Sequence, residues 1–183
     1  AHAEGTWADL GAGEGLFSRA LAALLGKGGR VIAVDRDRRA LRVLERRARG
    51  RRDGAPIEAA LGDFLELEAV PALAGVRLDG TLFANALHFV AEPGAALRGL
   101  SVHLRSGARL VVVEYDRKTA NPWVPYPLPP GRLRAVAEDA GFGALDVVAQ
   151  RPSAYHREMY CAVTVWPGED EPPGPPGVAA AGS

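Results

Sequence analysis

Short apolar runs alternate with longer stretches of helical periodicity along most of the chain. Apolar residues recur at the three- and four-residue spacing of an amphipathic helix in residues 15–25, 37–49, 93–104 and 132–140. Compact runs typical of strands lie at residues 6–10, 30–35, 56–60, 79–85, 108–115, 144–149 and 158–166. Strands that alternate with helices of this length predict a mainly parallel sheet covered by helices on both faces.

The last two predicted strands differ from the others because only residues 150–157 separate them. So short a connection cannot carry a crossover, and it predicts an antiparallel C-terminal hairpin. We therefore expect an α/β fold with a seven-stranded, mostly parallel sheet. Residues 1–166 should form this single domain. Residues 167–183 are rich in proline and glycine and contain almost nothing to bury, so they should form a disordered tail.

The composition argues against several classes of protein. The chain has 22 basic and 22 acidic side chains, so it lacks the basic excess of most nucleic-acid-binding domains. Its single cysteine, Cys161, excludes internal disulfides and a multi-cysteine zinc site. No apolar run reaches the ~18 residues of a membrane helix, and no signal-peptide pattern opens the chain. We expect a soluble cytoplasmic protein, with nucleic acid disfavoured as a partner and no membrane contact.

The most informative stretch joins the first predicted strand to the first predicted helix. It reads DLGAGEG over residues 9–15, an acidic residue followed by three alternating glycines. Glycines permit a sharp turn and the close approach of a ligand, and ligands of open parallel sheets bind beyond the carboxyl ends of the strands. The dinucleotide pattern G-x-G-x-x-G/A would need glycine or alanine where Leu16 stands. A carboxylate at Asp9 would repel a phosphate, so the turn favours a cationic ligand.

This run resembles motif I of the class I S-adenosylmethionine-dependent methyltransferases, and the chain is most similar to those that act on small molecules. The resemblance implies a Rossmann-like sheet and S-adenosylmethionine (SAM) as cofactor, with the turn beneath its methionine part. That family has an acidic residue after the second strand that holds both ribose hydroxyls, and Asp35 ends the run VIAVD. Asp35 alone would serve NAD equally well.

The family also uses an acidic residue near the adenine amino group, just after the third strand. Asp63 fits this role and Phe64 could stack on the ring, although Asp63 is also suited to cap a helix. The residues assigned to the cofactor through the resemblance are Asp9, Gly11, Ala12, Gly13, Gly15, Asp35, Arg36, Asp63, Phe64 and Asn85.

Methyl transfer from a sulfonium is an in-line displacement, so the enzyme mainly aligns the nucleophile and excludes water. A general base is needed only where the acceptor loses a proton. His88, after the fourth predicted strand, and His156, between the last two, are the candidate catalytic residues. Each has a structural alternative, because His88 could pack within its loop and His156 could be exposed in a turn.

Residues 84–89, with the sequence ANALHF, bear on the identity of the methyl acceptor, because the corresponding turn borders the acceptor in this family. They lack the Asn/Asp-Pro-Pro-aromatic motif of base-amino methylation and the glutamate pair of the protein-arginine class. Cys161 also lacks the preceding proline common in base C5 methylation. A magnesium site would need carboxylates that Asn85, Glu114 and Asp116 only approximate, so we expect no metal.

Residues 121–127 combine prolines with aromatic side chains directly after the strongest strand. We expect a semi-rigid lid in which Trp123 and Tyr126 face an apolar or aromatic acceptor, with Tyr115 contributing to the same site. The alternative is a loop whose aromatic side chains pack on the domain surface.

One predicted helix carries Arg38, Arg42, Arg46 and Arg49 on a single face, while Leu41, Leu44 and Ala48 form a core stripe on another face. A solvated face is the expected role, and contact with RNA or an acidic partner is the alternative.

These observations predict a SAM-dependent methyltransferase that acts on a small, preferably aromatic, metabolite. The alternatives are a non-catalytic SAM-binding domain that acts through a partner, and an RNA methyltransferase. The oligomeric state is not indicated. Only residues 1–5 precede the first strand, where the family usually has one or two helices. We therefore expect a trimmed fragment, a domain of a larger protein or an open site.

Overall fold

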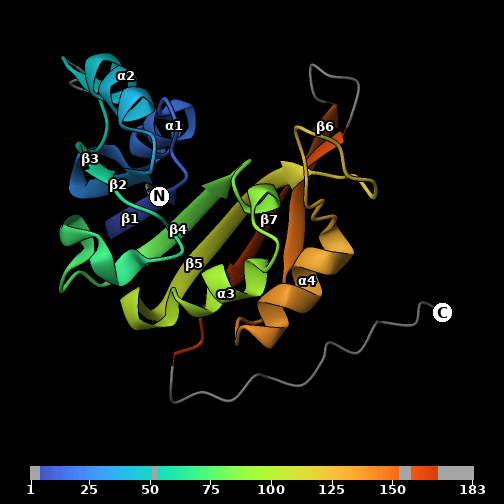
Figure 1. Cartoon of the computed structure of the whole chain (residues 1–183). Helices are drawn as coiled ribbons and strands as arrows, with labels where there is room; N and C mark the ends of the chain where they lie inside the picture. The colour runs from blue at the N-terminus through green and yellow to red at the C-terminus, as the bar shows by residue number, and fades with distance from the viewer. Residues whose placement is uncertain (1–4, 51–52, 153–157, 169–183) are drawn as a thin grey trace.

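The computed structural model describes residues 5–50, 53–152 and 158–168. In these residues one seven-stranded sheet has the order β3-β2-β1-β4-β5-β7-β6 (Figure 1). The strands are β1 (Gly5–Leu10), β2 (Gly29–Asp35), β3 (Ile57–Leu61), β4 (Leu78–Ala84), β5 (Leu104–Tyr115), β6 (Asp146–Pro152) and β7 (Glu158–Val165). Strands β1 to β5 are parallel, and β7 runs antiparallel between β5 and β6. The predicted α/β class and its antiparallel hairpin are confirmed.

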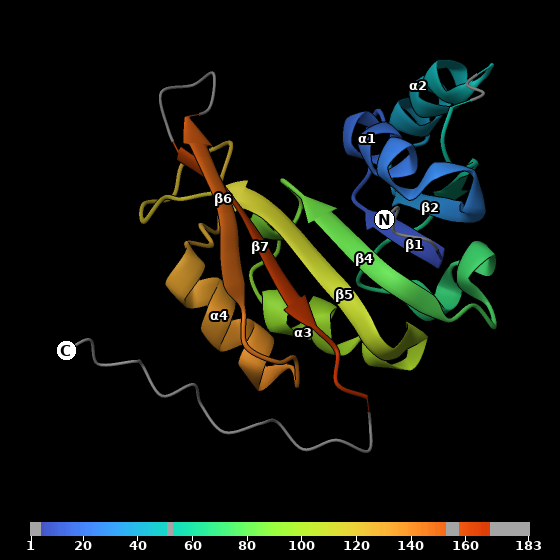
Figure 2. The ribbon, with the colours of Figure 1, turned by 180° about the vertical axis from the view of Figure 1, so that it is seen from behind.

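Four α-helices cover the two faces of the sheet in the described residues. They are α1 (Leu16–Leu25), α2 (Arg38–Ala48), α3 (Pro93–Arg98) and α4 (Pro130–Asp139). Single turns of 3-10 helix lie at Gly26–Gly28, Leu67–Ala69, Pro71–Leu73, Leu87–Phe89 and Ser101–His103. Helices α1 and α2 cover one face of the sheet at the end formed by β1, β2 and β3 (Figures 1 and 2). Helices α3 and α4 cover the other face, over β4, β5 and β7.

Side-chain alternation along the parallel strands explains this division. Trp7 and Val31 pack with α1, whereas their neighbours Ala8 and Ile32 join the larger core on the other face. Because both faces are covered there, the central strands are apolar at nearly every position.

Strands β5 and β7 are covered by α-helices on one face only within the described residues (Figure 2). The other face presents Val111, Val113, Cys161 and Val163, each half-buried. This partial burial raises the pKa of the Cys161 thiol, so the thiol behaves as a small apolar side chain. No helix in the described part of the chain combines the length and apolar character that a bilayer span requires.

The prediction of one helix over residues 93–104 was wrong. Helix α3 ends at Arg98 and is capped by Gly99, and Leu104 already begins β5 by pairing with Leu78. The strand resumes its register at Arg109 after an irregularity that includes Gly107, whose φ is 80°. Residues 169–183 of the predicted tail lie outside the described residues, whereas Pro167 accepts a hydrogen bond from Ser106.

Candidate functional site

The turn between β1 and α1 brings bare backbone to the carboxyl edge of the sheet. The Gly11 and Ala12 amides both donate to the Val34 carbonyl of β2, at 2.9 and 3.0 Å. Gly11 has a φ of 79°, and a Cβ there would lie 2.6 Å from the Ala86 Cβ. Gly15 has a φ of 77° and lies against Leu44, where a Cβ would come within 2.5 Å. Glycine is therefore required at both positions by backbone conformation and by space.

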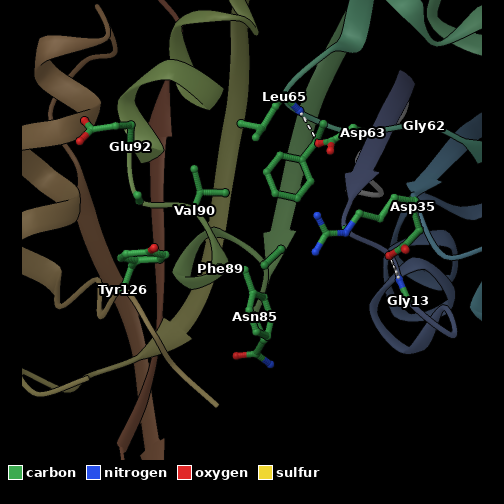
Figure 3. A pocket seen from close by; sticks show the side chains of 15 residues that line it. Gly13, Asp35, Gly62, Asp63, Leu65, Asn85, Phe89, Val90, Glu92 and Tyr126 are labelled. Carbon is green, nitrogen blue, oxygen red and sulfur yellow. Dashed lines mark hydrogen bonds between the residues drawn. The ribbon is translucent and has the colours of Figure 1, made fainter. Parts of the chain in front are cut away.

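A cleft of about 630 Å³ opens at this edge, within the usual size range of ligand sites. Loops that follow β1, β2, β3 and β4 form it, together with one side chain from the proline-rich segment. The lining residues are Gly11, Gly13, Asp35, Arg36, Gly62, Asp63, Phe64, Leu65, Asn85, Ala86, Phe89, Val90, Ala91, Glu92 and Tyr126. Figure 3 shows Asp35 and Gly13 on one side of the cleft and Glu92 and Tyr126 on the other.

The Asp35 carboxylate is held rigidly at the end of β2. Its Oδ2 accepts from the Gly13 amide at 2.7 Å (Figure 3). Its Oδ1 accepts from the Asp37 amide, also at 2.7 Å. Each carboxylate oxygen has a second acceptor position, so a ligand with two neighbouring hydroxyls can still bind. The ribose-reading residue inferred from the sequence therefore lines the same cleft as the glycine turn.

Asp63 and Phe64 line the neighbouring wall, after β3. The Oδ1 of Asp63 accepts from the Leu65 amide at 2.9 Å, which makes a side-chain-capped turn rather than a helix cap (Figure 3). The Phe64 ring packs edge-to-face on Phe83, with ring centroids 5.4 Å apart. An acceptor group and an aromatic ring are thus fixed side by side.

Asp9 lies beneath the glycine turn and does not line the cleft. Its Oδ2 accepts from the Ser18 hydroxyl at 2.5 Å, and its buried Oδ1 has no partner in the described part of the chain. Burial raises the pKa of Asp9 to about 6. The Ser18 hydrogen bond opposes this shift and the nearby Asp35 charge adds to it. Asp9 can influence a ligand only through this field and through the turn that it supports.

Asn85 occupies a strained position where β4 ends. Its φ of 54° is the only positive value for a non-glycine residue in the described ranges. The Asn85 amide donates to the Val113 carbonyl at 2.8 Å, which draws the loop toward β5. Its buried side-chain Oδ1 has no hydrogen-bond partner among the described residues. Strain and an unsatisfied acceptor in one lining residue are typical of a ligand-binding position.

His88 and Glu114 form a buried pair behind this loop. The His88 Nδ1 lies 2.6 Å from Glu114 Oε2, and the His88 backbone amide donates to Oε1 at 3.2 Å. Because an ionised carboxylate only accepts, Nδ1 carries the shared hydrogen. The His88 carbonyl accepts from the Tyr126 amide at 3.0 Å, so the pair connects β4, β5 and the proline-rich segment.

The structure does not bring every predicted residue into the cleft. Tyr126 lines it and is 43% exposed, whereas Trp123 is 81% exposed and lies outside it. Tyr115 and His88 do not line it, and their ring centroids are 6.0 Å apart. Ala12 and Gly15 shape the turn without reaching the cleft surface. His156 lies outside the described residues.

Sequence reasoning missed several residues of this site. Ser18 holds Asp9, and Glu114 holds His88; Glu114 was considered only as a metal ligand. Phe89 and Glu92 line the cleft because the loop after β4 turns back across it. The only sequence signal for Ser18 is a small polar residue in the first turn of a helix that follows a buried carboxylate.

Comparison with known proteins agrees with this geometry. A family model described as "Methyltransferase domain" matches residues 8–110. No curated protein sequence matches the chain. A SAM-dependent methyltransferase from Methanosarcina mazei has a similar structure, with 16% identity, a TM-score of 0.70, and coverage of 92% of this chain and 95% of that chain.

Two further solved structures have the same fold. A SAM-dependent methyltransferase from Aquifex aeolicus has 18% identity and a TM-score of 0.68, covering 91% of this chain and 85% of the other. An arsenic(III) SAM methyltransferase from Chlamydomonas reinhardtii has 18% identity and a TM-score of 0.67. The match covers 88% of this chain and 62% of the algal protein.

The match to the methyltransferase family model spans more than half of the chain and includes the glycine turn, Asp35, Asp63 and Asn85. The chain therefore belongs to the methyltransferase domain family, and its fold is the one found in SAM-dependent methyltransferases. The resemblance inferred from the sequence is confirmed at this level.

Proposed function

We propose that the cleft binds SAM and transfers its methyl group to a small, preferably aromatic, molecule. The observation that carries the proposal is the convergence of a bare glycine turn and the anchored Asp35 carboxylate on one cleft. In the proposed pose, Asp35 accepts the ribose hydroxyls, and Asp63 accepts from the adenine amino group beside the Phe64 ring. Gly11 and Gly13 let the methionine part approach the main chain.

The residues present suit such a ligand. Among the residues that the structure describes, two buried oxygens lack hydrogen-bond partners: the carboxyl Oδ1 of Asp9 beneath the turn and the amide Oδ1 of Asn85 in the loop after β4. The Asn85 oxygen can accept a hydrogen bond from a ligand in the cleft, whereas Asp9, which does not line the cleft, can act on a positively charged group only through its field. When bound, SAM supplies an electrophilic methyl group on a positively charged sulfur.

The far side of the cleft supports a small apolar acceptor. Phe89, Val90 and Tyr126 line it, and Phe89 is 54% exposed. Cofactor and acceptor must share about 630 Å³, which favours an acceptor of few atoms. His88 does not line the cleft, so we assign it to positioning the loop after β4 rather than to proton transfer.

Replacing Asp35 with alanine should weaken SAM binding about 100-fold. The change removes a charged acceptor of two hydroxyl hydrogen bonds and releases the Gly13 amide. Isothermal titration of the folded variant with SAM measures the loss, and NAD serves as a comparison ligand for the wild type. Asp37→Ala is the control, because Asp37 caps α2 and does not line the cleft. Wild-type protein that binds NAD but not SAM would contradict the proposal.

Transfer itself is tested with radiolabelled SAM against a panel of small phenols and nitrogen heterocycles, with RNA oligonucleotides in parallel. Tyr126→Ala should raise the KM for an active small acceptor roughly tenfold, because it removes an aromatic wall of the cleft. Trp123→Ala should leave KM unchanged, because Trp123 lies outside the cleft. Tight SAM binding without transfer to any acceptor would favour a non-catalytic binding domain.

A further inference from the structure

Positive charge is concentrated in one short segment of an otherwise acidic chain. Residues 36–52 hold nine of the 22 basic side chains and two of the 22 acidic ones. This segment therefore carries a net charge of +7 and the remainder carries −7. The neutral total that argued against a polyanion partner is an average over two regions of opposite sign. Binding to a polyanion depends on the local potential, and this potential is strongly positive here.

Seven of the nine arginines of this segment lie in the described residues, and all seven are exposed. We call the exposed arginines 36, 38, 39, 42, 46, 47 and 49 the arginine surface. Leu41 and Leu44 are buried against the sheet, which fixes the orientation of α2 and turns the arginines outward. Figure 1 shows α2 at one end of the molecule, beyond β2 and β3.

Among the described residues, few side chains of the arginine surface are neutralised by an ion pair. Arg47 pairs with Glu14 at 2.7 Å. Within the part of the chain that the structure describes, Arg42 and Arg46 have no ion-pair partner. Holding so many like charges together destabilises the folded chain, and a bound polyanion would remove that cost.

The geometry suits a linear polyanion. Arg38, Arg42 and Arg46 follow one another at four-residue steps, each advancing about 6 Å along the helix. All of these cations are arginines, and the guanidinium binds phosphate through two parallel hydrogen bonds.

The arginine surface is continuous with the cleft. Arg36 belongs to both, directly after the Asp35 carboxylate. Across the cleft, Phe89 and Tyr126 offer exposed rings. A cationic track that leads to exposed aromatic rings is the arrangement by which proteins hold single-stranded nucleic acid, through backbone charge and base stacking.

We propose that the arginine surface binds the phosphodiester backbone of single-stranded nucleic acid and directs one end of the strand toward the cleft. This interaction is separate from SAM binding and independent of which small acceptor is methylated. The acceptor proposed above enters the cleft itself, whereas the strand lies along α2.

The test is fluorescence anisotropy with a labelled single-stranded RNA of mixed sequence, measured without SAM at a series of salt concentrations. Arg42→Gln/Arg46→Gln should weaken binding roughly tenfold and reduce the slope of log K against log salt by about 1.4, about 0.7 for each lost phosphate contact. Glutamine keeps the helix propensity of arginine. The control is Arg98→Gln/Arg109→Gln, which removes two exposed arginines outside the arginine surface and should change neither value.

Single-stranded DNA and polyglutamate of equal length separate the possible partners. The proposal predicts binding of either nucleic acid and at least tenfold weaker binding of polyglutamate. It is overturned if the wild type does not bind RNA, if both double variants lose affinity equally, or if polyglutamate binds as tightly as RNA. SAM titration of the Arg42→Gln/Arg46→Gln variant should match the wild type. Loss of RNA binding is then distinct from failure of the cofactor site.

Discussion

Replacing Glu114 with alanine should destabilise the protein by about 3–5 kcal/mol, the usual cost of removing one partner from a buried ion-paired or hydrogen-bonded couple. The carboxylate accepts from both the backbone amide and the ring of His88, and both residues are buried. Alanine would leave two donors unsatisfied and a void behind the loop after β4. That loop supplies Asn85 and Phe89 to the cleft, so SAM affinity should also fall, by roughly tenfold.

Urea unfolding of Glu114→Ala, Glu114→Gln and His88→Ala measures the effect on stability. Glutamine keeps one acceptor but turns an amide group toward the second donor, so an intermediate loss of about 1–3 kcal/mol is expected. The loss of stability in the double variant Glu114→Ala/His88→Ala should be smaller than the sum of the two single losses. Each single change leaves the other buried side chain without its hydrogen-bond partner. Glu138→Ala on the exposed side of α4 is the control. Additive losses would show that the two side chains are not coupled.

The helices and strands that were predicted correctly are those whose sequence pattern lies within the element itself. Strand β2 contains a continuous apolar run, and β1 is apolar apart from Thr6 and Asp9, as strands covered on both faces should be. Their predicted bounds differ by one residue from the observed ones. Helix α2 was predicted because its leucines recur at helical spacing while arginines fill the other positions. The helix over residues 93–104 failed because the pairing of Leu104 with Leu78, which starts β5, depends on a distant strand.

The same distinction holds for the cleft. The glycine turn, Asp35 and Asp63 are recognisable because each directly follows its own strand. Glu114 meets His88 only because β4 and β5 pair with Ala84 opposite Val113, which brings residues 26 positions apart into contact. No local pattern reports that register.

The proline-rich segment shows a finer limit. Trp123 and Tyr126 are three residues apart and equally aromatic, yet only Tyr126 lines the cleft. The Asn121 side chain accepts from the Trp123 and Val124 amides, and this turn leaves the indole exposed. Which ring faces inward follows from that turn and from the Tyr126 amide bonding to His88, and neither contact could be inferred from residue type.

Replacing Asp9 with asparagine should have opposite effects on stability and on function. Burial raises the pKa of the Asp9 carboxyl from 3.8 to about 6, so the folded state binds more protons than the unfolded state between these values. The stability of the wild type must therefore fall as pH rises through this window, by about 3 kcal/mol for a shift of about 2 units. Asparagine cannot ionise. The variant should gain stability relative to the wild type as pH increases, reaching about 2–3 kcal/mol above pH 7.

The ionised Asp9 carboxylate lowers the stability of the folded protein, and a role in ligand binding would explain why it is buried there. Ionised Asp9 places negative charge directly under the turn proposed to hold the cationic methionine part of SAM, so Asp9→Asn should weaken SAM binding roughly tenfold or more at neutral pH. For the same reason, wild-type affinity should decline as pH falls below about 6, where Asp9 takes up a proton.

Urea unfolding across this pH range, paired with SAM titration, measures both effects on the same samples. Ser18→Ala is the informative companion, because losing the hydroxyl donor at 2.5 Å raises the pKa of Asp9 further and destabilises the protein at neutral pH. A variant Asp9→Asn that is less stable than the wild type at every pH would mean that the ionised carboxylate is part of the fold's own stability. It would then have no separate role in attracting the cofactor.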